Sequence, residues 1–221
     1  FKMTNETLQK YEKRKIQFSS ELSTVEKKIS LISNVRLSIV VFTLVPVIIL
    51  YKLNFQTLSG IVFIAGLTGF IIIIRYHDRL FTAKARLNIL IKINTNGILR
   101  ITDQWHTFNN NGEEFRNDDH PYTTDIDVFG DSSLFQWINA THTYFGKIFL
   151  SSALADFQGE YPSKTENTVN PERIKTNQEA VKELAPLLDF RQNIEAACFD
   201  NHCSENPQSI IDWSENKNQN C

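Results

Sequence analysis

Two uncharged stretches decide the fold: Leu37–Tyr51, LSIVVFTLVPVIILY, and Leu58–Ile74, LSGIVFIAGLTGFIIII. As helices they reach about 22 and 25 Å at 1.5 Å per residue, close to the ~30 Å hydrocarbon core of a bilayer. The alternative is a pair of buried helices in a soluble core. Neither stretch has the polar face that a water-facing helix keeps, and Pro46 and three glycines interrupt them. The sequence therefore favours a transmembrane hairpin.

Basic residues gather on one side of this hairpin. Three precede the first stretch and four follow the second, whereas the connecting turn carries only Lys52. The seven flanking residues are Lys27, Lys28, Arg36, Arg75, Arg79, Lys84 and Arg86. The positive-inside rule therefore predicts that both termini are cytoplasmic and that only a short turn is external. In that orientation the Asn-x-Thr sequons at Asn5 and Asn139 are irrelevant.

The segments before and after the hairpin show a coiled-coil pattern, with apolar residues at alternating spacings of three and four. The first series is Leu8, Tyr11, Lys15, Phe18, Leu22, Val25, Ile29 and Ile32, and the second is Leu80, Leu87, Ile91, Asn94, Ile98, Ile101 and Trp105. Because the hairpin returns the chain to the same side, we predict antiparallel pairing, with Val25 near Leu87. The polar Lys15 and Asn94 then lie within about one turn of each other and fix the register. The alternative is that each arm pairs with another copy.

The second half of the chain differs in charge and in pattern. Residues 1–100 carry 15 Lys and Arg against 5 Asp and Glu, whereas residues 101–221 carry 8 against 20. We predict a solvated acidic loop over 107–131, because its aspartates do not have EF-hand spacing. Helical signals then predict a helix capped by Ser132, a second from Tyr144 to Ala155, a third from Pro171 and a short one near Leu187.

The sequence contains no recognisable catalytic, cofactor-binding or metal-binding set. It has no Ser/His/Asp arrangement and no phosphate loop of the G-x4-G-K-[ST] type. Three cysteines, Cys198, Cys203 and Cys221, lie near the end without a disulfide framework, which indicates a reducing compartment. Cys198, His202 and Cys203 resemble half of a zinc site, but no second ligand pair with suitable spacing exists.

Residues 110–195 resemble the MutS family, and more narrowly its bacterial membrane-anchored branch. The run HPYTTDIDVFGDSSLFQWINATHTYFGKIFLSSAL contains the family patterns S-L-F-x-x-[LI]-[ND] and T-x-T-x-x-G-[RK], and a later segment is similar to R-Q-x-A-[VI]-x-E-L. The matching residues include Leu134, Phe135, Asn139, Thr141, Thr143, Gly146, Lys147, Gln178 and Glu183. The chain departs from the pattern at Ala140, Tyr144 and Asn177, where Arg, Pro and Arg are frequent.

This resemblance implies the N-terminal part of a MutS-like, DNA-dependent ATPase in the bacterial inner membrane. The chain is then the anchor and the start of the core or lever domain, without catalytic residues or a cofactor of its own. ATP and Mg binding, mismatched-DNA binding and homodimer contacts are expected in C-terminal regions beyond Cys221. The alternative is a non-catalytic membrane adaptor whose acidic helical domain docks protein partners.

The predicted fold is all-α and has six segments. They are a cytoplasmic coiled-coil arm (1–35), a transmembrane helical hairpin (36–76), a returning arm (77–106), an acidic linker (107–131), the start of a MutS-like helical domain (132–200) and a polar tail (201–221).

Overall fold

The computed structural model of the chain describes residues 2–155 and 171–200. Within these ranges every regular element is helical, and no strand is present. Two long helices, α1 (Lys2–Lys52) and α2 (Gln56–Ile101), precede four shorter ones. The predicted all-α fold class is therefore confirmed, including the two long helices that pack against each other.

The chain divides into two compact units. The first, here called the hairpin unit, comprises residues 9–92 and contains most of α1 and α2. The second, here called the loop-and-helix unit, comprises residues 1–8 together with 93–221. Each unit is described separately below.

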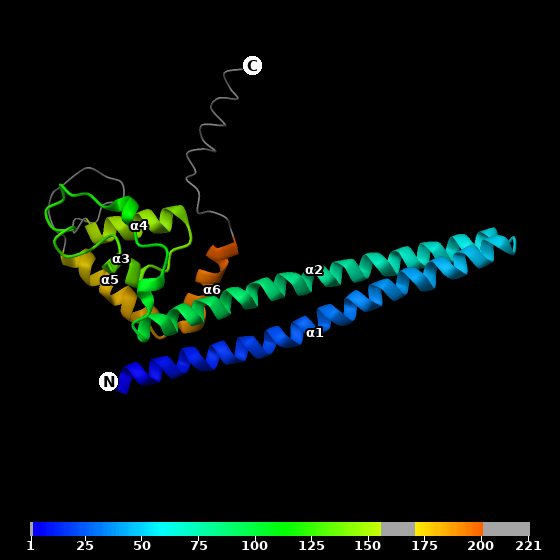
Figure 1. Cartoon of the computed structure of the whole chain (residues 1–221), viewed down its shortest axis with the longest axis horizontal. Helices are drawn as coiled ribbons and strands as arrows, with labels where there is room; N and C mark the ends of the chain where they lie inside the picture. Colours follow the sequence, from blue (N-terminus) through cyan, green and yellow to red (C-terminus); the bar gives the residue numbers. More distant parts are fainter. Residues whose placement is uncertain (1, 156–170, 201–221) are drawn as a thin grey trace, which may run out of the picture. The chain divides into compact units, whose positions relative to one another are not determined.

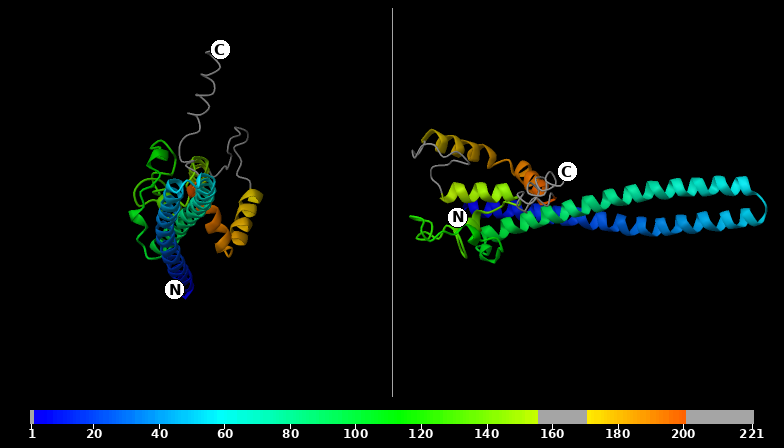
Figure 2. Two further views of the ribbon diagram at one scale, coloured as in Figure 1. Left: turned by 90° about the vertical axis from the view of Figure 1, so that its right-hand side faces the viewer. Right: turned by 90° about the horizontal axis from the view of Figure 1, so that it is seen from above.

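In the hairpin unit α1 and α2 lie side by side and run in opposite directions (Figure 1; Figure 2, right). The turn that joins them is a Schellman motif, in which Asn54 has a left-handed backbone with φ of 65°. The Phe55 N–H donates to the Leu50 carbonyl at 3.0 Å, and the Asn54 N–H donates to the Tyr51 carbonyl at 3.1 Å. These two bonds satisfy carbonyls that the end of α1 leaves open, so the chain reverses within three residues.

The predicted coiled-coil seam is visible in the burial of α1. From Tyr11 to Ile32 every seam residue is half-buried, while most of the residues between them are exposed. The Lys84 ammonium lies 2.7 Å from the Glu26 carboxylate on the facing helix. This ion pair puts the two helices within one turn of the predicted register, in which Val25 lies near Leu87.

The four shorter helices all belong to the loop-and-helix unit: α3 (Leu134–Ile138), α4 (Tyr144–Ala155), α5 (Pro171–Leu184) and α6 (Leu188–Asp200). The predicted bounds of α4 and the predicted start of α5 agree with the structure. The helix predicted near Leu187 is longer than expected, because α6 continues to Asp200.

Two helix ends differ from the sequence prediction. The N-cap of α3 is Ser133 and not Ser132, because the Ser133 hydroxyl accepts a hydrogen bond from the Gln136 N–H while Ser132 has a left-handed backbone. Helix α2 ends at Ile101, where Asp103 adopts φ of 61° and the Gln104 N–H bonds to the Leu99 carbonyl. Trp105, included in the predicted heptad series, therefore lies beyond the helix, in the 3-10 turn η1 (Trp105–Thr107).

The core of the loop-and-helix unit is a cluster around Phe135, which is fully buried. Val128 and Phe129 are also buried, and the Phe129 and Phe115 rings lie 5.7 and 5.6 Å from the Phe135 ring. The prediction of a solvated acidic linker over 107–131 is wrong for part of this segment. Its aspartates and Ile126 are exposed, but Phe115, Val128 and Phe129 fold inward and form most of the core.

Candidate functional site: a hairpin that could span a membrane

The apolar stretches of the hairpin unit present their side chains outward. Phe42 is 77% exposed, and Leu37, Ile61, Ile64 and Ile72 are all more than 60% exposed. The helices are long and apolar enough to cross a membrane, and almost none of their most apolar residues is buried. A helix in a soluble core would bury this surface, because apolar area exposed to water is unfavourable by about 25 cal/mol per Å². A lipid environment removes that cost.

Three hydroxyl groups within these stretches, those of Ser38, Ser59 and Thr68, donate to backbone carbonyls. Thr68 donates to the Ile64 carbonyl at 2.8 Å, one turn earlier on α2. Ser59, which is buried, donates at 3.1 Å to the Val47 carbonyl on the other helix. Hydrocarbon offers no water to satisfy polar groups, so internal bonds of this kind are what a membrane-spanning helix requires.

The two helices approach each other closely at Gly66. A β-carbon built on Gly66 would lie 2.8 Å from the β-carbon of Thr43 and would overlap the rest of that side chain. At Gly60 and Gly69 a β-carbon would meet nothing within 4 Å. Gly66 therefore acts as the small residue that lets helix backbones come together, as in packed transmembrane helices.

The predicted membrane-flanking basic residues occupy both helices. Arg36, Arg75, Arg79 and Arg86 are exposed, whereas Lys84 is half-buried and paired with Glu26. Lys52 is also exposed and lies at the end of α1, beside the turn. Most of the basic residues therefore lie at one end of the apolar segment, and Lys52 alone lies at the other.

Five of the nine residues that carry the family resemblance pack in the core or shape the chain around α3 and α4. Phe135 fills the core, and the Asn139 carboxamide accepts hydrogen bonds from the Thr141 N–H and hydroxyl at 2.9 and 2.7 Å. Thr143 accepts from the Gly146 N–H at 3.1 Å and so caps α4. These bonds shape the connection between α3 and α4.

Of the other four residues of the resemblance, Lys147 is half-buried in an ion pair and three are exposed. The Lys147 ammonium pairs with Glu114 at 3.1 Å, and Leu134 is exposed. Gln178 and Glu183 are exposed on α5. The structure therefore brings the first part of the motif together around α3 and α4 and leaves the later part on a separate helix.

Sequence reasoning missed two polar contacts made by α2, of which the first is buried and the second is partly exposed. The Asn94 and Gln192 side chains, 0% and 2% exposed, exchange two hydrogen bonds of 3.2 and 2.9 Å between α2 and α6. Arg100 donates to the carbonyls of Trp137 and Asn139 at the C-terminal end of α3. A polar residue in an otherwise apolar heptad series indicates that Asn94 makes a specific contact. It does not indicate that the partner is Gln192, 98 residues further along the chain.

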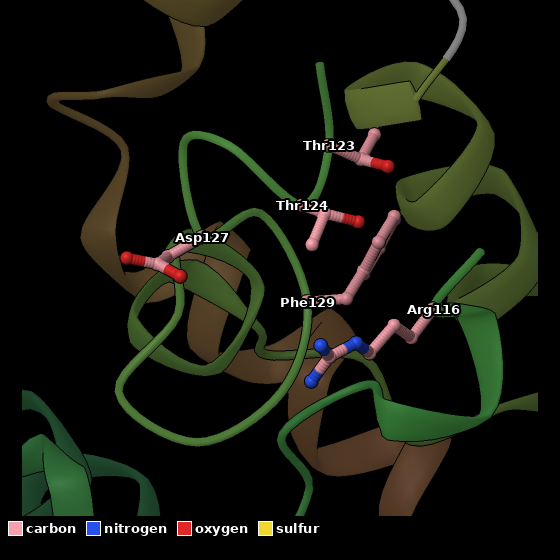
Figure 3. A pocket seen from close by; sticks show the side chains of 5 residues that line it. All are labelled: Arg116, Thr123, Thr124, Asp127 and Phe129. Atoms are coloured by element: carbon pink, nitrogen blue, oxygen red, sulfur yellow. The ribbon is translucent and has the colours of Figure 1, made fainter. Parts of the chain in front are cut away.

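A small cavity lies beside the aromatic core and is lined by Arg116, Thr123, Thr124, Asp127 and Phe129 (Figure 3). Its volume is about 40 Å³, which is room for a few water molecules and far less than the roughly 300 Å³ of a small-molecule site. Arg116 donates to Asp118 at 3.0 Å, and this hydrogen bond raises the pKa of the guanidinium. This cavity is therefore too small for a nucleotide.

Among the described residues no group of three or more His, Cys, Asp or Glu side chains could hold a metal ion. His202 and Cys203 of the zinc-like triplet lie outside the described residues. No protein-family model, curated protein or solved structure matches the chain.

Proposed function

We propose that the chain is a membrane anchor, in which the hairpin unit crosses a bilayer twice and holds a helical domain at its surface. The observation that carries the proposal is the outward-facing apolar surface of both helices over the two uncharged stretches. The backbone-bonded hydroxyls of Ser59 and Thr68 and the close approach at Gly66 support it.

The charge distribution supports a cytoplasmic location for both termini, in a bacterial inner membrane. Arg36 and Arg75 border the two stretches at one end, and Lys52 is the single basic residue at the other. Cysteine labelling tests this orientation in a variant whose three native cysteines are serine. Gln56→Cys should react with an impermeant maleimide from outside intact spheroplasts, and Asp119→Cys should react only after lysis. Outside labelling of Asp119→Cys would contradict the orientation.

We further propose that this anchor belongs to a MutS-like, DNA-dependent ATPase and carries the start of its lever domain. The support is the resemblance around α3 and α4, where Phe135, Asn139 and Thr143 have specific packing or capping roles. In this proposal ATP, Mg and mismatched DNA bind to C-terminal regions, which also form a homodimer. The described residues supply the tether and none of the catalytic groups.

The sequence of the gene beyond Cys221 tests this assignment directly. We expect a phosphate loop and a Walker-B-like strand downstream, and ATP hydrolysis by the full-length protein that duplex DNA stimulates. A stop codon shortly after Cys221 would contradict the ATPase proposal and leave the anchor proposal standing.

The alternative is a non-catalytic adaptor that docks protein partners. One observation favours it: every described side chain of α5 is exposed, including Val181 at 68%. Exposed apolar side chains on an amphipathic helix are typical of protein-binding surfaces. An early stop codon together with a binding partner lost in Val181→Glu would support the adaptor.

A further inference from the structure

We propose that Arg36, Arg75 and Arg79 form an arginine collar that binds the phosphate groups of anionic phospholipids. The inference rests on the proposed membrane anchor and adds the chemistry of the lipid that the anchor selects. Three observations support it. The arginines lie at the same end of the apolar segment, they are exposed, and none forms an ion pair with a described carboxylate.

The three arginines lie at the same end of the apolar segment. Arg36 directly precedes the first uncharged stretch and Arg75 directly follows the second. Two contacts fix the helix register on either side of them, Glu26 with Lys84 and Thr43 with Gly66. Because the helices are antiparallel, each step forward along α1 corresponds to a step back along α2. This register places Arg36 opposite Ile73 or Ile74, next to Arg75.

None of these guanidinium groups has an ion pair with a residue that the structure describes. All three are exposed, and so is Asp78, the nearest carboxylate in the sequence. Two like charges at one level of a helix pair repel each other unless an anion lies between them. A guanidinium binds phosphate through two parallel hydrogen bonds, which makes phosphate a fitting anion for this position.

Distance along the helices separates the collar from the other basic residues. Arg79 is about 7 Å beyond Ile74, within the ~8 Å Debye length at physiological salt. Lys28 and Lys84 lie about 13 to 15 Å from the apolar stretches, and Lys84 is paired with Glu26. Only the three arginines are therefore close enough for strong attraction to the headgroup layer.

The opposite end of the segment carries Lys52 alone, so the lipid preference should arise at one face of the bilayer. A basic residue near an anionic surface strengthens binding by about fivefold. Three such residues predict a preference for anionic over zwitterionic lipid well above tenfold.

Native mass spectrometry of the full chain in detergent tests the collar with phosphatidylglycerol and phosphatidylcholine as probes. We expect the wild type to bind phosphatidylglycerol at least tenfold more tightly. The triple variant Arg36→Gln, Arg75→Gln, Arg79→Gln should lose most of this preference. The matched control Lys10→Gln, Lys13→Gln, Lys15→Gln removes the same charge about 32 to 39 Å further along α1 and should keep the preference. Circular dichroism verifies that both variants stay helical.

Equal affinity of the wild type for the two lipids would overturn the collar, and so would an equal loss in the control variant. Resistance of the wild type to alkaline carbonate extraction separates the two proposals. If the chain resists extraction but shows no lipid preference, the collar is wrong and the anchor stands. If the wild type is extracted, both are wrong.

Discussion

The two units of this chain distribute polar and apolar groups in opposite ways. In the hairpin unit large apolar side chains such as Phe42 and Ile64 face outward, and the buried Ser59 bonds to the backbone. In the loop-and-helix unit a small aromatic core is surrounded by buried amides and hydroxyls, and no buried side-chain polar atom among the described residues lacks a partner. The first arrangement suits a bilayer as solvent, and the second suits water.

The difference shows which forces hold each unit. Burial within the chain contributes little to the apolar part of the hairpin, so in the proposed anchor its stability depends on lipid that covers the outer surface. The loop-and-helix unit buries few apolar residues, so directional hydrogen bonds from residues such as Gln136 must fix its loops. Gln136 accepts from the Ser132 N–H at 2.8 Å and donates to the Phe108 carbonyl at 2.6 Å.

The largest expected effect is the loss of membrane insertion when charges enter the apolar segment. Each of Phe42→Asp and Ile64→Asp costs about 3 kcal/mol near a bilayer centre, so the double variant loses about 6 kcal/mol. We expect it to leave the membrane fraction of lysed cells. The control, Ile16→Asp, changes a residue that is equally exposed but outside the stretches, and it should stay in that fraction. If the double variant and the control were found in the same fraction, the assignment of the two uncharged stretches to the bilayer would be contradicted.

The next effect concerns the aromatic core. Phe135→Ala removes a fully buried ring and should destabilise the loop-and-helix unit by about 3–5 kcal/mol. Urea unfolding in mild detergent, followed by tryptophan fluorescence, measures the change, because Trp105 and Trp137 belong to this unit. Phe149→Ala, on the exposed side of α4, should shift the transition by less than about 0.5 kcal/mol. A similar shift for both variants would contradict the assignment of Phe135 to the buried core and of Phe149 to the surface.

A smaller effect distinguishes directional bonding from simple burial. Asn94→Leu removes the two hydrogen bonds that the buried Gln192 amide exchanges with Asn94, at a cost of about 1–3 kcal/mol. Adding Gln192→Leu should recover most of that loss, because the buried amide that lost these two bonds is then replaced by an apolar side chain. The same urea unfolding measures both variants, and a double variant that is less stable than the single one would contradict the pairing.

The smallest effect tests the helix register. Lys84→Glu places two carboxylates where an ion pair now lies, and should destabilise the hairpin unit by less than about 1 kcal/mol. The charge swap Glu26→Lys with Lys84→Glu should restore the wild-type midpoint of unfolding by sodium dodecyl sulfate. If the charge swap does not restore the midpoint, Glu26 and Lys84 are not in contact and the register is wrong.

Local periodicity predicted much of the fold. The length of the two uncharged stretches predicted the helical hairpin. Apolar residues at spacings of three and four predicted the seam of α1. Capping signals predicted α4 and the start of α5. The resemblance selected Phe135, Asn139 and Thr143, but their packing and capping roles emerged only from the structure. The charge pattern identified the basic flank but not which of its members are paired.

Contacts between distant residues could not be predicted in this way. The partner of Asn94 is 98 residues further along, and no local pattern at Gln192 marks it. Val128 and Phe129 lie in an acidic segment, and their burial depends on Phe135, which periodicity alone does not place beside them. The shift of the α3 N-cap to Ser133 depends on the left-handed backbone of Ser132, which a serine rarely adopts.

Flotation of the wild-type chain tests the central claim, that residues 37–51 and 58–74 lie in a bilayer. Membranes from expressing cells are washed with sodium carbonate at high pH and layered beneath a sucrose gradient. We predict that the chain rises with the lipid and that detergent is required to release it. A folded, monodisperse chain left in the aqueous layer would contradict the account.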